Sequence, residues 1–211
     1  MPLSDRDYMR TQPPPQRRTR NVRLGSYFRV NPIWVIIGIN VLMFIVTTIS
    51  RDVLLELGLI PAAFWDRPWT IITNMFVHAN FGHIFGNMIT LFFFGRFLNM
   101  LVGGKKVLLV YFVGGIVGNI LYLLLGEPLS IAVGASGAVY AIAGALVVMT
   151  PRIRVLLWFF VPMPLWVLVL VFFLFWSFIP GVAWQAHIGG LVVGLIAGYF
   201  YRKKMPYIFI R

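Results

Sequence analysis

Four side chains that can take part in nucleophilic, acid or base chemistry interrupt the apolar stretches of this chain: His83, Asn87, Ser136 and His187. Ser136 stands among small residues at the head of an apolar run, where a plain membrane helix would carry Leu or Val. Polar side chains deep in a membrane are expensive and are functional candidates by default. A serine paired with a histidine base is typical of acyl transfer.

The apolar runs contain no Asp or Glu, which argues against an aspartyl pair or a carboxylate-bound metal. The chain has no cysteine and no His-Glu-x-x-His motif, so thiolate metal sites and that class of metalloprotease are excluded. A zinc site built from His78, His83 and His187 remains formally open. We nevertheless expect no metal ion and no cofactor, and a serine nucleophile with a histidine base but no third acid.

Acyl transfer also needs hydrogen-bond donors for the developing oxyanion. His83 and Asn87 are four residues apart, so they share a helix face and can supply side-chain donors. Backbone amides at the positive end of a helix are further candidates, here those of Gly134, Ala135 and Ser136. Tyr140 lies one helical turn after Ser136, and we expect its ring to stack on His187 and orient it in place of an acid.

The composition is that of a polytopic membrane protein. Hydrophobic residues make up 60% of the 211 residues, charged residues make up 11%, and the mean hydropathy is +0.86. The apolar runs predict an all-α fold of six transmembrane helices: Ile33–Ser50, Phe81–Leu101, Val107–Leu125, Ser136–Thr150, Val155–Ile179 and Ala183–Tyr201.

The fourth run is too short to span a bilayer. Its 15 residues end before Pro151 and cover only about 22 Å of a hydrocarbon core roughly 30 Å thick. The backbone around Gly134 and Ala135 is therefore expected to dip into the membrane without being helical, which is tolerated where protein or a wet cavity satisfies it.

Small residues predict how the fourth and sixth helices meet. Gly190, Gly194 and Gly198 recur every four residues after His187, and Gly137 opens a similar small-residue face after Ser136. Such faces let helix backbones approach closely. If the two faces pack together, Ser136 and His187 meet.

The basic residues predict the topology. Placing the N-terminus in the cytoplasm puts 16 of the 18 Lys and Arg on that side and leaves only Arg51 and Arg67 outside. This placement explains the net charge of +12 without nucleic acid as a partner. We expect a multi-pass protein of the cell membrane with both termini cytoplasmic and a site that opens to the extracytoplasmic side.

The predicted domains follow from this topology. Residues 1–31 are Arg-rich and Pro-rich and predict a disordered cytoplasmic tail that contacts anionic lipid. Residues 32–204 form the six-span domain, with residues 51–80 as an external loop at the membrane interface, and residues 205–211 form a short cytoplasmic tail. The aromatic fifth span is expected to face lipid, with a mobile lateral gate as the alternative.

The ordered set of motifs resembles the rhomboid intramembrane serine proteases. The set comprises His78-x4-His83-x3-Asn87, Gly134-Ala135-Ser136-Gly137, Tyr140, and the histidine followed by glycines at 190 and 194. The resemblance covers roughly residues 33–201. It implies a six-helix fold with a shortened fourth helix, Ser136 as nucleophile, His187 as general base, and His83, Asn87 and the Ser136 amide lining the oxyanion hole.

The same resemblance implies that the substrates are single-span membrane proteins cut near the outer end of their span. One position departs from the family, because Trp69 is followed by Thr70 where many members carry Arg. Two alternatives stay open: an inactive relative that binds transmembrane helices, and, with little support, a small transporter or channel. The oligomeric state stays unknown.

Overall fold

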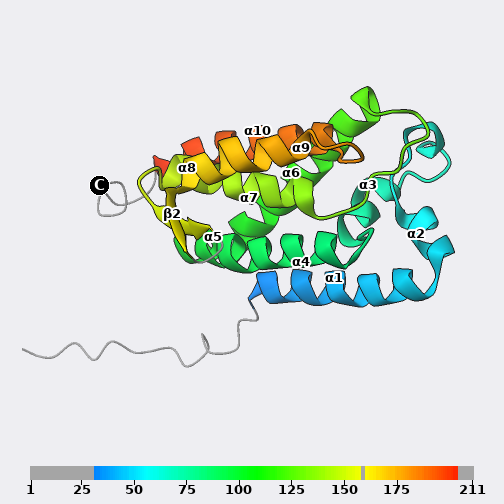
Figure 1. Cartoon of the computed structure of the whole chain (residues 1–211), viewed down its shortest axis with the longest axis horizontal. Coiled ribbons are helices and arrows are strands. Elements are labelled where there is room, and N and C mark those ends of the chain that lie inside the picture. Colours follow the sequence, from blue (N-terminus) through cyan, green and yellow to red (C-terminus); the bar gives the residue numbers. More distant parts are fainter. Residues whose placement is uncertain (1–30, 158–159, 204–211) are drawn as a thin grey trace, which may run out of the picture.

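A computed structural model describes residues 31–157 and 160–203. Within these ranges the chain is mostly helical and forms an elongated bundle (Figure 1). The tails predicted for residues 1–31 and 205–211 lie outside the described residues, apart from Asn31. The elements, in which η4 and η5 are 3-10 helices and η6 and η7 are π-helical, are α1 Pro32–Ile49, α2 Arg51–Leu57, η4 Pro61–Ala63, α3 Thr70–Thr73, η5 Asn74–Phe76, α4 Phe81–Thr90, η6 Leu91–Gly95, α5 Arg96–Val102, α6 Gly104–Leu125, α7 Ser136–Met149, β1 Arg154–Leu157, β2 Val161–Pro164, α8 Leu165–Val167, η7 Leu168–Phe173, α9 Leu174–Ser177 and α10 Trp184–Arg202.

Three helices in the described part of the chain are long and apolar enough to cross a membrane: Pro32–Ile49, Phe81–Val102 and Gly104–Leu125. The second of these runs without a break through α4, η6 and α5. The structure therefore agrees with a mostly helical membrane protein. The count of six spans stays a prediction.

Asparagine side chains begin two of these helices. The side chain of Asn31 accepts the N–H of Ile33 at 3.0 Å, and Pro32 occupies the first helical position, where its missing N–H costs nothing. The side chain of Asn80 accepts the N–H of His83 at 2.9 Å and so begins α4. Gly103 separates α5 from α6 with a φ of +82°, a conformation that favours glycine.

Helix α7 is the centre of the bundle. It has 14 residues, of which 12 are buried, and it ends one residue before the predicted Thr150, so the prediction of a short fourth helix is confirmed. The N–H and hydroxyl of Thr150 both donate to the carbonyl of Leu146 at 2.8 Å, and Pro151 then stops the helix. Helices α6 and α10 flank α7 (Figure 1).

The prediction of a continuous fifth helix from Val155 is wrong in its first part. Strands β1 and β2 form an antiparallel hairpin there, with Arg154 opposite Pro164 and Leu157 opposite Val161, and helical structure begins only at Leu165. The two prolines in β2 explain the difference. Proline has no N–H to donate to a helix, and it favours extended backbone in the residue before it.

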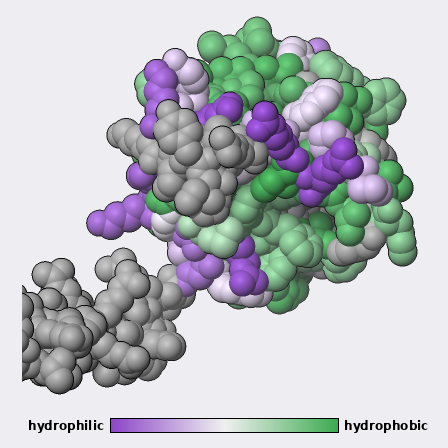
Figure 2. All heavy atoms as spheres, turned by 90° about the vertical axis from the view of Figure 1, so that its left-hand side faces the viewer, coloured by the Kyte–Doolittle hydropathy of each residue, from purple (hydrophilic) through white to green (hydrophobic). Residues whose placement is uncertain are grey.

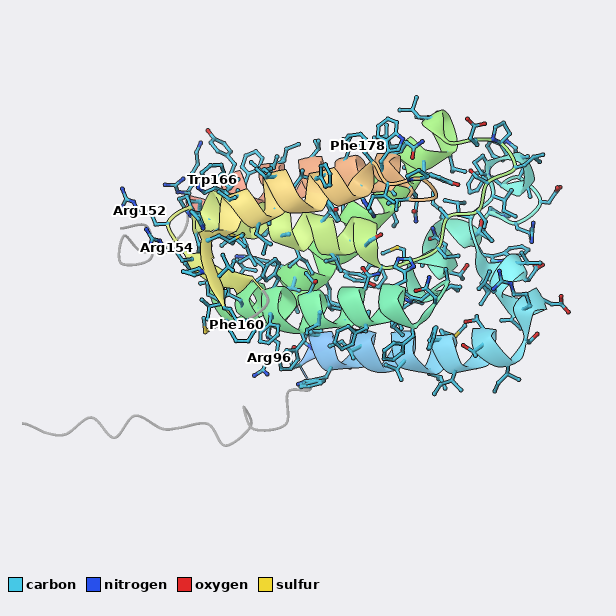
Figure 3. The ribbon with its side chains drawn as sticks, viewed as in Figure 1. Arg96, Arg152, Arg154, Phe160, Trp166 and Phe178 are labelled. Carbon is cyan, nitrogen blue, oxygen red and sulfur yellow. The ribbon has the colours of Figure 1, made fainter. Side chains whose placement is uncertain are left out.

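The two ends of the bundle differ in chemistry. Arg96, Arg152 and Arg154 lie at the end that carries the hairpin, whereas Phe178 lies toward the opposite end, near α9 (Figure 3). A view onto the hairpin end shows hydrophilic residues gathered there and hydrophobic residues around the flanks (Figure 2). Because β1 follows the end of α7, the head of α7 faces the other end.

Candidate active site

Ser136 and His187 meet at the heads of two neighbouring helices. The Oγ of Ser136, the first residue of α7, lies 2.8 Å from Nε2 of His187 in the first turn of α10. His187 is 8% exposed, and Ser136 is partly buried. A serine hydroxyl and an imidazole nitrogen at this distance form the hydrogen bond that a nucleophile needs with its base.

Close packing of α7 on α10 produces this distance. Gly190 packs against the carbonyl of Gly137, and Gly198 packs against the carbonyl of Ala145, so that a Cβ on Gly198 would come within 2.6 Å of that oxygen. Gly194 makes the same kind of contact with Ala141. The small-residue faces expected from the sequence thus lie against each other.

Tyr140 lies flat against the imidazole of His187. The two ring centroids are 4.3 Å apart and the ring planes differ by 12°. A ring stacked in this way restricts rotation of the imidazole about its Cβ–Cγ bond.

A serine that the sequence did not single out completes this network. The Oγ of Ser177, at the end of α9, lies 2.7 Å from Nδ1 of His187 and 2.9 Å from the hydroxyl of Tyr140. Ser177 is fully buried. One signal in the sequence points to it, because Ser177 is the only residue with a hydroxyl group in the apolar and aromatic run 165–179.

The turn before Ser136 depends on Gly134. Its φ is +123°, which side chains disfavour, and a Cβ there would lie 2.6 Å from Nε2 of His83 and 3.7 Å from Oγ of Ser136. The imidazole of His83 therefore faces this turn directly, from the first turn of α4. Because Gly134 has no Cβ, the backbone of the turn can lie against this imidazole.

Two of the three predicted oxyanion amides already have acceptors. The N–H of Gly134 donates to the carbonyl of Asn74 at 2.9 Å, and the N–H of Ala135 points at Nε2 of His78 at 3.5 Å. The N–H of Ser136 begins α7 and has no acceptor within that helix. Of the three amides, it is the one oriented by a helix start to receive a developing negative charge.

His78 lies just before α4 and supports the turn. It is 1% exposed, and burial, together with the neighbouring His83, lowers the pKa of its imidazole to about 3. The ring is therefore neutral at pH 7 and can accept the N–H of Ala135. Its ring packs edge-on against that of His83, with centroids 5.0 Å apart.

Asn87 lies one turn after His83 on the same face of α4. Its side-chain amide donates to the carbonyl of His83 at 3.0 Å, and the residue is 7% exposed. An amide group has two N–H bonds, so this contact leaves a second one for another acceptor.

A buried pair of amides holds η5, the 3-10 helix that begins with Asn74. Asn74 donates to Asn119 of α6 at 3.1 Å, and Asn119 donates back at 2.8 Å. Asn119 also donates to the carbonyl of Ile71. The backbone of Asn74 in turn accepts the N–H of Gly134, so this pair connects α6 to the turn before Ser136.

The segment 51–80 packs against the site and is largely folded. Leu59 and Ala132 exchange two backbone hydrogen bonds of 2.9 and 2.8 Å, which fix the chain shortly before Gly134. Thr70, at the position that departs from the family, is buried and donates its hydroxyl to the carbonyl of Arg67 at 2.6 Å. Trp65 is 88% exposed. The expected place of this segment at the membrane interface stays a prediction.

The described residues contain no cluster of ligands for the zinc site that the sequence left open. Across residues 31–157 and 160–203, no three His, Cys, Asp or Glu side chains are grouped so that they could hold a metal ion.

Comparison with known proteins identifies the family. A family model described as the rhomboid domain matches residues 66–204. The chain belongs to the rhomboid family. It is 26% identical over 205 aligned positions to rhomboid protein 1, mitochondrial, of Saccharomyces cerevisiae, which covers 85% of this chain and 57% of the yeast protein. It is 28% identical over 186 positions to rhomboid-like protease 3 of Toxoplasma gondii, which covers 82% of this chain and 70% of that protein.

A plant relative extends the comparison. The chain is 32% identical over 161 positions to RHOMBOID-like protein 12, mitochondrial, of Arabidopsis thaliana, which covers 65% of this chain and 47% of that protein. This rhomboid chain thus spans about half the length of the yeast and plant relatives. The relatives include a protein named as a protease, which supports the interpretation of this chain as a membrane protease.

Proposed function

We propose that this rhomboid protein is an intramembrane serine endopeptidase whose nucleophile is Ser136 and whose general base is His187. The observation that carries the proposal is the 2.8 Å contact between Oγ of Ser136 and Nε2 of His187 at the head of a buried helix. The membership of the family and a relative named as a protease support it.

The chemistry follows from this contact. Nε2 of His187 takes the proton of the Ser136 hydroxyl as the oxygen attacks the carbonyl carbon of a peptide bond. The imidazolium then gives that proton to the leaving amine as the C–N bond breaks, which leaves an ester on Ser136. A water molecule, deprotonated by the same imidazole, hydrolyses the ester and frees the serine.

The oxyanion of each tetrahedral intermediate needs donors near Ser136. We assign this role to the N–H of Ser136 and to the side chains of His83 and Asn87, since the turn at Gly134 brings His83 close to the nucleophile. Gly134 and Ala135 shape the turn, and their own N–H groups serve its folding.

Six spans and the topology of the chain belong to the same proposal. The arginines at the hairpin end suit the cytoplasmic face, and the head of α7 then lies toward the opposite, extracytoplasmic face. Substrates would be single-span membrane proteins cut near the outer end of the span. A peptide must leave its helix there before its carbonyl can reach Ser136.

Cleavage in proteoliposomes tests the proposal. The purified chain should cut a single-span membrane protein, and Ser136→Ala and His187→Ala should each abolish cleavage while the proteins stay folded by circular dichroism. A fluorophosphonate should label Ser136, and His187→Ala should block the labelling. Continued cleavage by purified Ser136→Ala would end the proposal, and a folded, unlabelled wild-type protein would favour a helix-binding relative without activity.

A further inference from the structure

The side of His187 that faces away from Ser136 is occupied by Ser177. In a serine and histidine pair without a carboxylate, something must decide which ring nitrogen carries the proton. The Oγ of Ser177 lies 2.7 Å from Nδ1 and is fully buried, so no bulk water competes for this nitrogen. In the described part of the chain, the hydroxyl of Ser177 is the group that forms a hydrogen bond with Nδ1.

We propose that Ser177 is a positioning residue, which accepts the Nδ1–H of His187 and so keeps the lone pair of Nε2 directed at Ser136. This inference rests on the proposed function. It assigns to a serine of α9 the part that a carboxylate has in other serine hydrolases.

The hydrogen-bonding capacity of the groups allows this direction. A neutral imidazole carries one N–H, and a hydroxyl has one hydrogen and two acceptor lone pairs. If Ser177 accepts from Nδ1, its own hydrogen can point to the hydroxyl of Tyr140 at 2.9 Å. Nε2 is then unprotonated and can take the proton of Ser136 at 2.8 Å.

The same contact serves the next step of the reaction. When His187 becomes an imidazolium, both ring nitrogens are donors, and the Nδ1–H bond to Ser177 is kept without any movement. The opposite tautomer would place the hydrogen on Nε2, where it blocks proton transfer from Ser136. Stacking on Tyr140 alone restrains the ring plane but does not choose between these tautomers.

The alternative is a purely structural serine that anchors α9 to the bundle. The outer face of this segment is exposed, with Phe175 74% and Phe178 64% exposed, so an anchoring bond would raise stability. A structural role predicts that Ser177→Ala lowers the free energy of unfolding and leaves the tautomer of His187 and the kcat of the folded protein unchanged. The positioning role predicts that Ser177→Ala changes the tautomer of His187 and lowers the kcat of the folded protein.

The experiment combines kinetics with the imidazole spectrum of the full chain. The protein has only three histidines, so nitrogen-15 labelling of histidine gives three imidazoles, and the resonance of His187 is identified by its loss in His187→Gln. Ser177→Ala should lower kcat by about 10- to 100-fold with KM unchanged, because the wrong tautomer is inactive. It should also move His187 from the Nδ1–H form toward the Nε2–H form.

Two control variants separate the roles. Ser177→Thr keeps the hydroxyl and should restore most of kcat and the wild-type tautomer. Thr47→Val removes a buried hydroxyl that bonds only to backbone in α1, at 2.9 Å from the carbonyl of Met43, and should change neither. An Nε2–H tautomer of His187 in the wild type, or an unchanged tautomer and kcat in Ser177→Ala, overturns the inference.

These outcomes are distinct from failure of the proposed function. If Ser136→Ala remains active, the proposed function fails whatever the tautomer of His187 is. If Ser136→Ala is inactive and Ser177→Ala behaves as the wild type in both kcat and spectrum, only the positioning role fails.

Discussion

The contact between Gly190 and Gly137 predicts that one added methyl group separates the reacting side chains. A Cβ on Gly190 would lie 2.8 Å from the carbonyl carbon of Gly137, the residue that follows Ser136. Since carbon atoms pack at about 3.5–4.0 Å, α10 and α7 must move apart by about 1 Å. The 2.8 Å hydrogen bond between Ser136 and His187 would then stretch to about 3.8 Å, which is too long for a hydrogen bond.

Gly190→Ala should therefore lower kcat/KM by about 100-fold, the usual effect of a 1 Å misplacement at a reacting centre. Overpacking should also lower the free energy of unfolding by about 1–3 kcal/mol, partly offset by the better helix propensity of alanine, which is worth about 1 kcal/mol. Cleavage of a single-span substrate in proteoliposomes measures the first effect. Reversible unfolding in mixed micelles measures the second.

Gly38→Ala is the matched control. Gly38 lies inside α1, and a Cβ there would meet nothing within 4 Å. The control should keep wild-type activity and gain up to about 1 kcal/mol of stability. If Gly190→Ala behaves like Gly38→Ala in both assays, close packing of α10 on α7 does not set the geometry of the site.

Two further variants test the turn before the nucleophile. Gly134→Ala should remove nearly all cleavage, because alanine disfavours a φ of +123° and its methyl group would displace His83; a variant with more than half of the wild-type kcat/KM would refute this account of the turn. Asn119→Leu should lower the free energy of unfolding by about 1–3 kcal/mol, because it leaves the buried amide of Asn74 without its partner. Unfolding in mixed micelles measures this loss, and a stability equal to that of the wild type would contradict it.

The short central helix and its pairing could be predicted from local features of the sequence. Pro151 ends α7, and the glycines at 190, 194 and 198 mark the face of α10 that packs on it. Both signals are periodic or positional and need no knowledge of the rest of the chain. The meeting of Ser136 and His187 follows from these two helices alone.

The remaining details depend on contacts between distant segments. The acceptors of the Gly134 and Ala135 amides, Asn74 and His78, lie about 60 residues earlier in the chain, and no local pattern specifies that pairing. The aromatic run around Ser177 predicts a lipid-facing helix, so the sequence does not single out this serine. The apolar residues of the hairpin β1–β2 predict a membrane span, although the prolines of β2 argue for extended backbone.

The burial of α7 has a consequence for the surrounding lipid. None of its residues is exposed and 12 of the 14 are buried, so neighbouring protein covers most of the surface of the helix that begins with Ser136. A helix of about 21 Å that touched acyl chains would have to thin the bilayer around it. Enclosed by its neighbours, it escapes that mismatch. Any response of this protein to acyl-chain length must therefore reach the nucleophile through the tilt of the outer helices.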